Sequence, residues 1–326
     1  MLHITNGDSA AEQLRSAGLS GRILPWRDVL HEGPVPAGLS LDSLREVRAR
    51  YIAGKRWGKL KNVLHEFAER DAVLELYSTF GETVLWFEYD LYDQLQLLQI
   101  LHYLDSHPVE AHPISLICVN DTLGTISPGR ISDLFARRIM LSEDQMNLGS
   151  RAWITFCSPD PTLLEEMAKV GTPSLPPLAA ALFRHLQQFP STRNGLSLSE
   201  QNALDAISRG RSRLSEAFVA SHHEREQPVF LGDMVFASYL EALSHVEVPL
   251  VTFDDGSAIT APHLIDSDGS FWDRSALLTK VGQEVLIGKQ DHARLNGMDR
   301  WLGGVYIAGR GALWRWDSDT QSLHYE

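Results

Sequence analysis

Thr83–Glu88 reads TVLWFE, a run that is almost entirely apolar. Such a run is typical of a parallel strand that is covered on both faces. Asp90 comes soon after it and can cap a helix, because a carboxylate at that position accepts N–H groups of the first turn. The leucines from Leu91 to Leu101 then recur every three or four residues and share one helix face. This part of the chain therefore predicts a buried strand followed by a helix.

Two other segments repeat this strand-then-helix order. Residues 2–5 are strand-like; Asn6-Gly7-Asp8 then forms a turn, and Ser9–Glu12 has the pattern of a capping box. Residues 114–119 form another strand, and 22–26 is a candidate strand with Pro25 at its end or on a sheet edge. Three such units favour an open parallel sheet, so we expect a Rossmann-like α/β fold with flanking helices.

A length of 326 residues favours two domains. Residues 130–190 have a helical pattern that includes a capping box at Ser142–Gln145, and Ser191–Gly195 has the composition of a linker. We therefore expect a Rossmann-like domain with a helical extension over residues 1–190, and a second domain over residues 196–326.

The second half has a different pattern. A capping box at Ser197–Glu200 opens a helix, and further helices are expected at 213–221 and 232–245, with a strand at 246–253. Residues 276–286 look like the leucine-threonine-x-x-glycine helix that often closes winged-helix domains. The order predicts a smaller, winged-helix-like α+β domain.

Charge argues against nucleic acid as a partner. The chain carries a formal net charge of −13, and its hydrophobic content of 44% is that of a globular protein. Residues 191–326 contain 12 basic and 19 acidic residues, and Glu226–Asp273 contains no lysine or arginine at all. Phosphate binding needs such cations. A protein partner, or packing against the first domain, is the better interpretation of the second half.

The termini and cysteines point to the cytoplasm. The chain begins MLHIT, with no basic start and no long apolar stretch, and no run approaches the roughly 20 residues of a membrane helix. Cys118 and Cys157 have no C-x-x-C spacing and are expected to be inert buried thiols. We expect a cytoplasmic protein without a membrane partner.

Three early motifs resemble those of an uncharacterised bacterial family, domain of unknown function 1835. They are Leu2–Ala11 (LHITNGDSAA), Trp26–Pro34 (WRDVLHEGP) and Trp86–Gln94 (WFEYDLYDQ). The resemblance covers about residues 1–125, and Leu295–Gly304 (LNGMDRWLGG) is similar to the end of longer members. It implies a Rossmann-like domain of unknown activity and supplies no catalytic residues.

The first candidate site is Asn6-Gly7-Asp8-Ser9. In an open α/β sheet, ligands bind outside the carboxyl ends of the strands, and the N-terminus of the next helix can hold an anion. The segment contains neither G-x-G-x-x-G nor a P-loop. It could bind a phosphate or nucleotide, or be only a tight turn and helix cap.

The second candidate is the loop Trp26–Pro34. His31 has an ordinary pKa suited to proton transfer near neutrality, Glu32 or Asp28 could orient it, and Arg27 could bind an anion. We expect His31 to line an open cleft at the carboxyl ends of the strands, with Asp8, Trp26 and Glu88 nearby. The alternative is a packed loop with solvated charges.

The third candidate is the acidic group Glu88, Asp90 and Asp93, with Gln94 beside it. Together with Asp8 and Asp28 it could offer oxygen ligands to a cation such as Mg²⁺. Carboxylates in a first helical turn also stabilise the helix dipole without any metal, and we assign no metal ligand here.

These patterns lead to a functional expectation and two alternatives. We expect a small, anionic or nucleotide-like ligand to contact Asn6–Ser9, Trp26–Asp28, Glu88 and Asp90. Hydrolase or transferase chemistry would use His31 and Glu32 as catalytic residues. The alternatives are a non-catalytic sensor or adaptor that acts through protein contacts and, less favoured by charge, a DNA-binding regulator. The sequence does not identify a cofactor.

Overall fold

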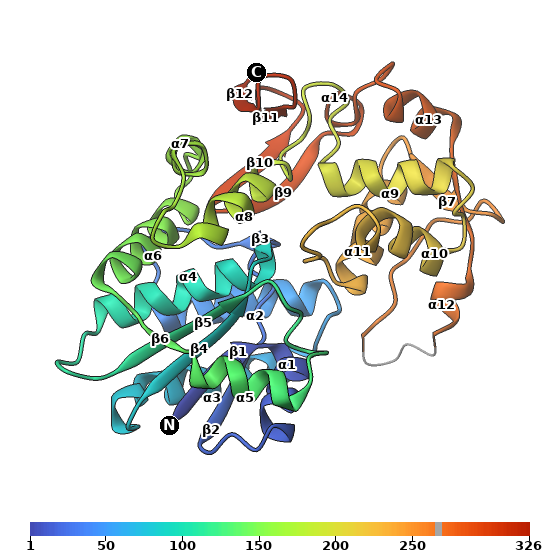
Figure 1. Cartoon of the computed structure of the whole chain (residues 1–326). Coiled ribbons are helices and arrows are strands. Elements are labelled where there is room, and N and C mark those ends of the chain that lie inside the picture. Colours follow the sequence, from blue (N-terminus) through green and yellow to red (C-terminus); the bar gives the residue numbers. More distant parts are fainter. Residues whose placement is uncertain (265–268) are drawn as a thin grey trace.

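The computed structural model describes residues 1–264 and 269–326. Its largest sheet has five strands in the order β2-β1-β4-β5-β6 (Figure 1). The strands are β1 (Leu2–Asn6), β2 (Arg22–Trp26), β4 (Thr83–Glu88), β5 (Ile114–Val119) and β6 (Ile139–Met140). The first four are parallel and β6 is antiparallel to β5. The prediction of an α/β fold with a mostly parallel sheet is confirmed.

Helices cover both faces of this sheet, which explains the apolar run in β4. Val84 and Trp86 belong to a core cluster with α1 (Gly7–Ser16) and α5 (Pro128–Ala136). Leu85 and Phe87 face the other way and join the main core. That side is covered by α2 (Leu41–Gly54), α3 (Leu60–Glu75) and α4 (Leu91–Ser106). A one-turn 3₁₀-helix, Tyr77–Thr79, follows α3.

Three more helices lie on the outer side of α4, as Figure 1 shows. They are α6 (Glu143–Phe156), α7 (Thr162–Val170) and α8 (Pro176–Leu186). Two predicted capping boxes are confirmed, because Ser142 pairs with Gln145, and Ser197 with Glu200, in both directions. The one predicted at Ser9 is wrong: α1 begins earlier, at Gly7, without a side-chain cap.

The second half contains short helices and a two-stranded sheet. Its elements are α9 (Leu198–Ser208), α10 (Leu214–Phe218), a π-helical turn (Val219–His223), α11 (Asp233–Ser244), β7 (Val251–Phe253), α12 (Ser270–Asp273), β8 (Ala276–Leu278), α13 (Lys280–Leu286) and α14 (His292–Asn296). The single helix predicted at 276–286 is wrong. Residues 276–278 pair with β7, and the Thr279 side chain accepts the Gly282 N–H to start α13.

The last strands return to the first half of the chain. They are β9 (Met298–Gly303), β10 (Val305–Gly309), β11 (Trp314–Asp317) and β12 (Ser322–Tyr325). β9 pairs in parallel with the two-residue strand β3 (Gly33–Pro34). Ser191 bridges Trp316, and Asn194 is fully buried. Residues 191–195 are therefore a packed connection between the halves and not an exposed linker.

Two features bear on the environment of the protein. None of the described helices is long and apolar enough to cross a membrane. Cys118 and Cys157 are free thiols, and burial raises the pKa of each to about 12. A thiol with such a pKa is almost entirely protonated near neutrality and is a poor nucleophile.

The strand order places a crevice at one edge of the main sheet. The chain runs from β1 outward to β2 and then returns to β4 on the other side of β1. In open α/β sheets, ligands bind beside such a reversal, at the carboxyl ends of the strands. Those ends carry the residues of all three predicted sites.

Candidate functional site

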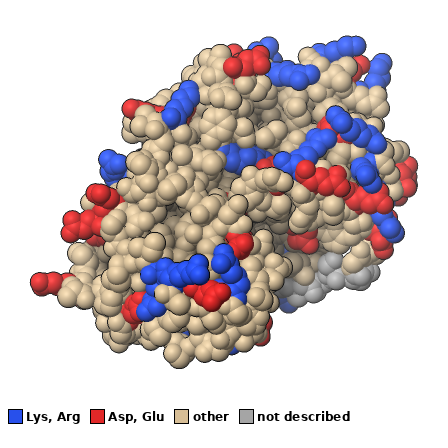
Figure 2. Space-filling model, viewed as in Figure 1, with Lys and Arg blue, Asp and Glu red and all other residues tan. Residues whose placement is uncertain are grey.

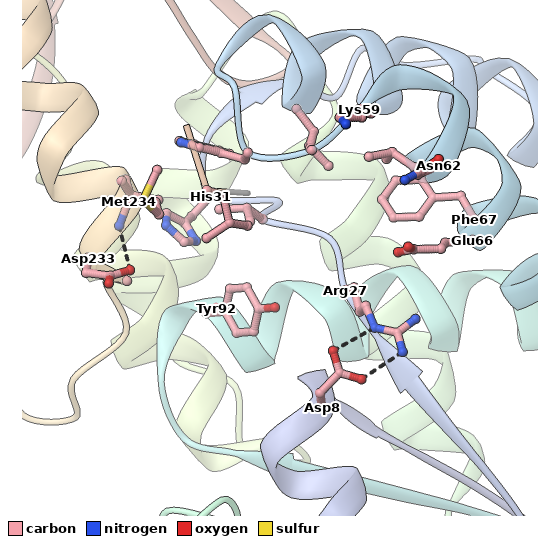
Figure 3. Close-up of a pocket in the computed structure, with 18 of the residues that line it drawn as sticks. Asp8, Arg27, His31, Lys59, Asn62, Glu66, Phe67, Tyr92, Asp233 and Met234 are labelled. Atoms are coloured by element: carbon pink, nitrogen blue, oxygen red, sulfur yellow. Dashed lines mark hydrogen bonds and ion pairs between the residues drawn. The ribbon is translucent and has the colours of Figure 1, made fainter. Parts of the chain in front are cut away.

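A cleft of about 870 Å³ lies beside the carboxyl ends of β1 and β2, between α3 and the start of α11 (Figure 3). Its walls are mostly apolar and aromatic: Val29, Ile52, Trp57, Val63, Phe67, Tyr92, Phe230, Met234, Val235 and Leu264. These residues come from both halves of the chain. Mostly apolar concavities of this size with a few polar groups are typical of small-molecule sites.

Asp8 and Arg27 form an ion pair at one side of the cleft. The Arg27 Nε donates to Asp8 Oδ2 at 2.9 Å and its Nη2 to Oδ1 at 2.7 Å, as the dashed lines of Figure 3 mark. Both side chains are well exposed, and the hydrogen bonds from Arg27 hold the pKa of Asp8 below its ordinary value. Arg27 is therefore largely neutralised by Asp8 and is not a free anion-binding cation.

Three polar side chains of α3 and its N-cap lie along the opposite wall. Lys59, Asn62 and Glu66 are exposed and line the cleft from one side of the helix (Figure 3). Their spacing of three and four residues places them on one helical face. Asp233, at the start of α11, completes the polar lining and accepts the N–H of Met234.

His31 lies in the wall of the cleft rather than at an open surface. It is 1% exposed, and its ring packs edge-on against Phe230 at 5.2 Å and Tyr92 at 5.9 Å between ring centroids. Neither imidazole nitrogen has a hydrogen-bond partner among the described residues. Burial lowers the pKa of His31 to about 4, so the ring is neutral near pH 7. His31 thus lines a cleft together with Asp8, as predicted, but its expected exposure is wrong, and Trp26 and Glu88 do not line this cleft.

Glu32 does not line the cleft with His31. Its carboxylate accepts hydrogen bonds from the Tyr239 hydroxyl and from Arg300 Nη2, the latter at 2.8 Å. Burial disfavours the charge of Glu32, but nearby Arg300, with His31 and Tyr239, holds its pKa below the ordinary value. The predicted catalytic partner of His31 is thus a buried member of a structural network.

Asp28 and Trp26 are also enclosed. Arg48 donates from Nε and Nη2 to Asp28 Oδ1 at 2.9 and 2.8 Å, and both side chains are almost fully buried. The Trp26 indole donates to Gln99 at 2.9 Å, and Arg70 lies over its ring. Neither residue lines the cleft. Both fix the loop that carries His31.

The carboxylates at the end of β4 form a separate cluster. The Asn6 amide donates to Glu88 at 3.1 Å and to Asp93 at 2.6 Å, and Asp90 accepts the Asp93 N–H at 3.0 Å as cap of α4. Burial raises the pKa of all three carboxyls, to about 7 for Asp90. Glu88 and Asp93 thus share the Asn6 amide, and each of the three acids accepts a backbone N–H.

This cluster does not extend to the other predicted acids. Asp8 and Asp28 are paired with arginines, and Glu88 lines a second pocket, of about 580 Å³. Among the described residues, no group of three histidine, cysteine, aspartate or glutamate side chains is placed to hold a metal ion. Gly7 is the first residue of α1, and Ser9 is exposed beside the backbone of Gly124.

Sequence reasoning missed the α3 side of the cleft and Phe230. One signal was available: Lys55, Arg56, Lys59 and Lys61 fall within seven residues of a chain with a net charge of −13. Phe230 and Met234 carried no such signal, because only the packing of α11 on the first half brings them to the cleft.

No family model matches the chain, and no curated protein is similar to it. The resemblance to domain of unknown function 1835 therefore stays a proposal. Two of the motifs behind it do meet in space: Gly33 pairs with Leu302 and Pro34 with Gly303.

Proposed function

We propose that this protein binds a small molecule in the cleft between α3 and α11, and that the bound molecule hydrogen-bonds to His31. The unpartnered imidazole of His31 carries the proposal. Among the described residues, His31 is the only one that lines the cleft and also has a buried side-chain nitrogen or oxygen without a partner. A buried polar group without a partner costs about 1–3 kcal/mol, and a ligand would supply the missing bond.

Binding without turnover is the better supported form of this function. An imidazole with a pKa near 4 is a weak base at neutral pH. Glu32 is engaged by Arg300 and does not line the cleft, and Glu88 lines the other pocket, so neither offers a second catalytic group inside the cleft. These placements favour a sensor over the hydrolase or transferase alternative.

Two contacts between the α2–α3 loop and α11 could transmit ligand binding to the second half of the chain. The Trp57 indole donates to Ser238 on α11 at 3.3 Å, and Arg56 pairs with Glu241 on the same helix. A ligand between α3 and α11 would add to these contacts and hold the two halves together. Binding would then change the surface that the second half offers to a partner protein.

A winged-helix-like arrangement of the second half belongs to this proposal. Its order is α9, α10, α11 and the antiparallel pair β7–β8, and Arg213, between the first two helices, bridges Ser275. That order is the one expected of the fold. DNA recognition through α11 is disfavoured, because nearly all of that helix is buried and it is acidic. On the face in Figure 2, acidic side chains lie among the basic ones.

The test is a thermal-shift and calorimetric screen of the purified protein against a metabolite library. Native mass spectrometry would reveal any molecule that co-purifies. We expect at least one compound to bind the wild type and to lose at least tenfold in affinity in His31→Leu and in Asn62→Trp, which fills the cleft. His65→Trp is the matched control, because His65 is exposed on α3 outside the cleft. Binding that survives both cleft variants would refute the proposal.

A further inference from the structure

Lys59 lines the cleft and belongs to a short basic segment of the chain. Three of the chain's six lysines, Lys55, Lys59 and Lys61, lie between residues 55 and 61. Among the residues that the structure describes, the only ion pair of a lysine is that of Lys169 with Glu165. Arg56, in the same segment, is paired with Glu241. Lys55 lies over the Tyr51 ring, so Lys59 is the lysine of this segment that lines the cleft, and it has no ion pair among the described residues.

The start of α3 adds to this positive potential. This helix of 16 residues has no acidic residue in its first turn and no side-chain cap from Lys59. The Asn62 and Val63 N–H groups bond to the Lys59 carbonyl, which leaves those of Leu60 and Lys61 without an acceptor among the described residues. Free N–H groups at a helix N-terminus favour a negatively charged group. Gly58 and Lys59 line the cleft at this point.

A second, independent observation concerns His31, which lines the same cleft. Both imidazole nitrogens of the buried His31 have no partner, and the ring lines the cleft. A neutral imidazole offers one donor and one acceptor, which suits the polar edge of a nucleobase. Trp57, Phe67 and Phe230 supply apolar walls for a flat ring. The His31 part and the Lys59 part of the cleft would therefore bind different parts of one molecule.

Asn62 and Glu66 project into the cleft from the same face of α3, further along the helix than Lys59 (Figure 3). Glu66 has no ion pair among the described residues, whereas Asp8 is paired with Arg27 and Asp233 accepts a backbone N–H. A free carboxylate suits ribose hydroxyl donors, as acidic residues do in dinucleotide sites. It also repels further negative charge, so it favours one phosphate over several.

We propose that the ligand of this cleft is a nucleoside monophosphate, with its base at His31, its ribose at Glu66 and its phosphate at Lys59 and the N-terminus of α3. This assignment rests on the proposed function, since it names the class of ligand for the same cleft. It places the phosphate at the α2–α3 loop and not at Asn6–Ser9, where the sequence suggested an anion.

Calorimetry with matched pairs tests the assignment. Adenosine, guanosine, cytidine and uridine are each compared with their 5′-monophosphates at low ionic strength. We expect one monophosphate to bind at least tenfold more tightly than its nucleoside, and added salt to reduce that difference. Lys59→Ala should remove the difference and leave the nucleoside affinity unchanged. Lys289→Ala, which removes an exposed lysine outside the cleft, should change neither.

Glu66 provides the second arm of the experiment. The 2′,3′-dideoxy form of the preferred monophosphate should bind the wild type several-fold more weakly than the ribonucleotide. In Glu66→Gln that penalty should shrink, while the monophosphate gains over its nucleoside because a repulsive charge is gone. Equal binding of nucleoside and monophosphate, or a preference that survives Lys59→Ala, would overturn the assignment.

Failure of the assignment and failure of the proposed function give different results. If a library compound other than a nucleotide binds and Asn62→Trp abolishes its binding, the cleft is a ligand site but the nucleotide assignment is wrong. If no compound binds in a manner sensitive to Asn62→Trp and His31→Leu, both proposals fall.

Discussion

Glu32 and Arg300 lie 268 positions apart and form a buried ion pair, in which Arg300 Nη2 donates to Glu32 Oε1 at 2.8 Å. The same nitrogen donates to the Tyr239 hydroxyl at 2.9 Å, and Gln188 donates to that hydroxyl at 2.8 Å. The pair therefore joins the loop after β2 to β9 and α11. It stands directly behind His31, next to Glu32 in the chain, and sets the position of the cleft wall.

Arg300→Met should destabilise the protein by about 3–5 kcal/mol, because it leaves the buried Glu32 carboxylate without its counter-charge. Urea unfolding at pH 7 measures the change. Arg310→Met is the control: Arg310 and Glu247 form an exposed pair, and its loss should cost less than about 1 kcal/mol. In the double variant Glu32→Gln/Arg300→Met the cost should be smaller than the sum of the single costs. Additive costs would show that the two residues do not interact.

His31→Leu should stabilise the free protein by about 1 kcal/mol at pH 7 and weaken ligand binding. Leucine fills a similar volume and removes two buried nitrogens that have no partner. Gains in stability that accompany a loss of function are expected where a site holds an unsatisfied polar group. A clear loss of stability would show that His31 is a structural residue.

The advantage of leucine should grow in acid. The pKa of His31 falls from an ordinary 6.5 to about 4 in the folded protein. The unfolded chain therefore binds more protons between these values, and the folded state loses up to about 3 kcal/mol as pH falls from about 6.5 to 4. Comparing the two proteins at pH 7, 5.5 and 4 isolates this contribution, since His185 and His222, also with lowered pKa values, titrate in both.

Asp90→Asn should have the opposite dependence on pH. Burial raises the pKa of Asp90 from 3.8 to about 7, so its ionisation destabilises the folded state as pH rises through that range. Asparagine stays uncharged and can still accept the Asp93 N–H as the cap of α4. We expect a gain of about 4 kcal/mol at pH 8 and almost none at pH 4, measured by urea unfolding.

A contrasting cap tests the cause of this effect. Asp291 caps α14 but also pairs with Arg315, so Asp291→Asn keeps a cap and loses an ion pair. It should destabilise the protein at pH 8. If Asp90→Asn behaves in the same way, the ionised Asp90 is stabilising and the assigned direction of its pKa is wrong.

Much of the α/β fold could be predicted from local sequence, because its strands are short apolar runs with a helix cap behind them. TVLWFE is apolar at successive positions because Leu85 and Phe87 face one core and Val84 and Trp86 the other. The prediction of one helix at 276–286 failed because its first residues pair with β7, a contact that the local pattern does not contain.

The site was less accessible to sequence reasoning. The motif around His31 was correctly predicted to follow β2. The burial and hydrogen bonds of its side chains, however, depend on residues far along the chain. Glu32 is engaged by Arg300 and Tyr239, and His31 is covered by Phe230. No periodicity or spacing links these positions. The α3 face could not be predicted because no motif or spacing connects it with the loop that carries His31.

Gly304→Ala should destabilise the protein by about 3 kcal/mol or more. Gly304 lies just after β9, and its N–H donates to the Phe156 carbonyl at 3.0 Å, which holds the two backbones together. An added Cβ would stand 1.9 Å from the Cys157 carbonyl oxygen and 2.2 Å from its carbon. These are backbone atoms at the end of α6, so no side-chain rotation relieves the clash, and overpacking of this kind typically costs 1–3 kcal/mol or more.

Gly311→Ala is the matched control, because its Cβ would meet no atom within 4 Å, and it should change stability by less than about 0.5 kcal/mol. Urea unfolding of both variants decides the matter: equal stabilities would mean that the end of β9 does not pack against α6, and that the C-terminal strands are not fixed to the first half at this point.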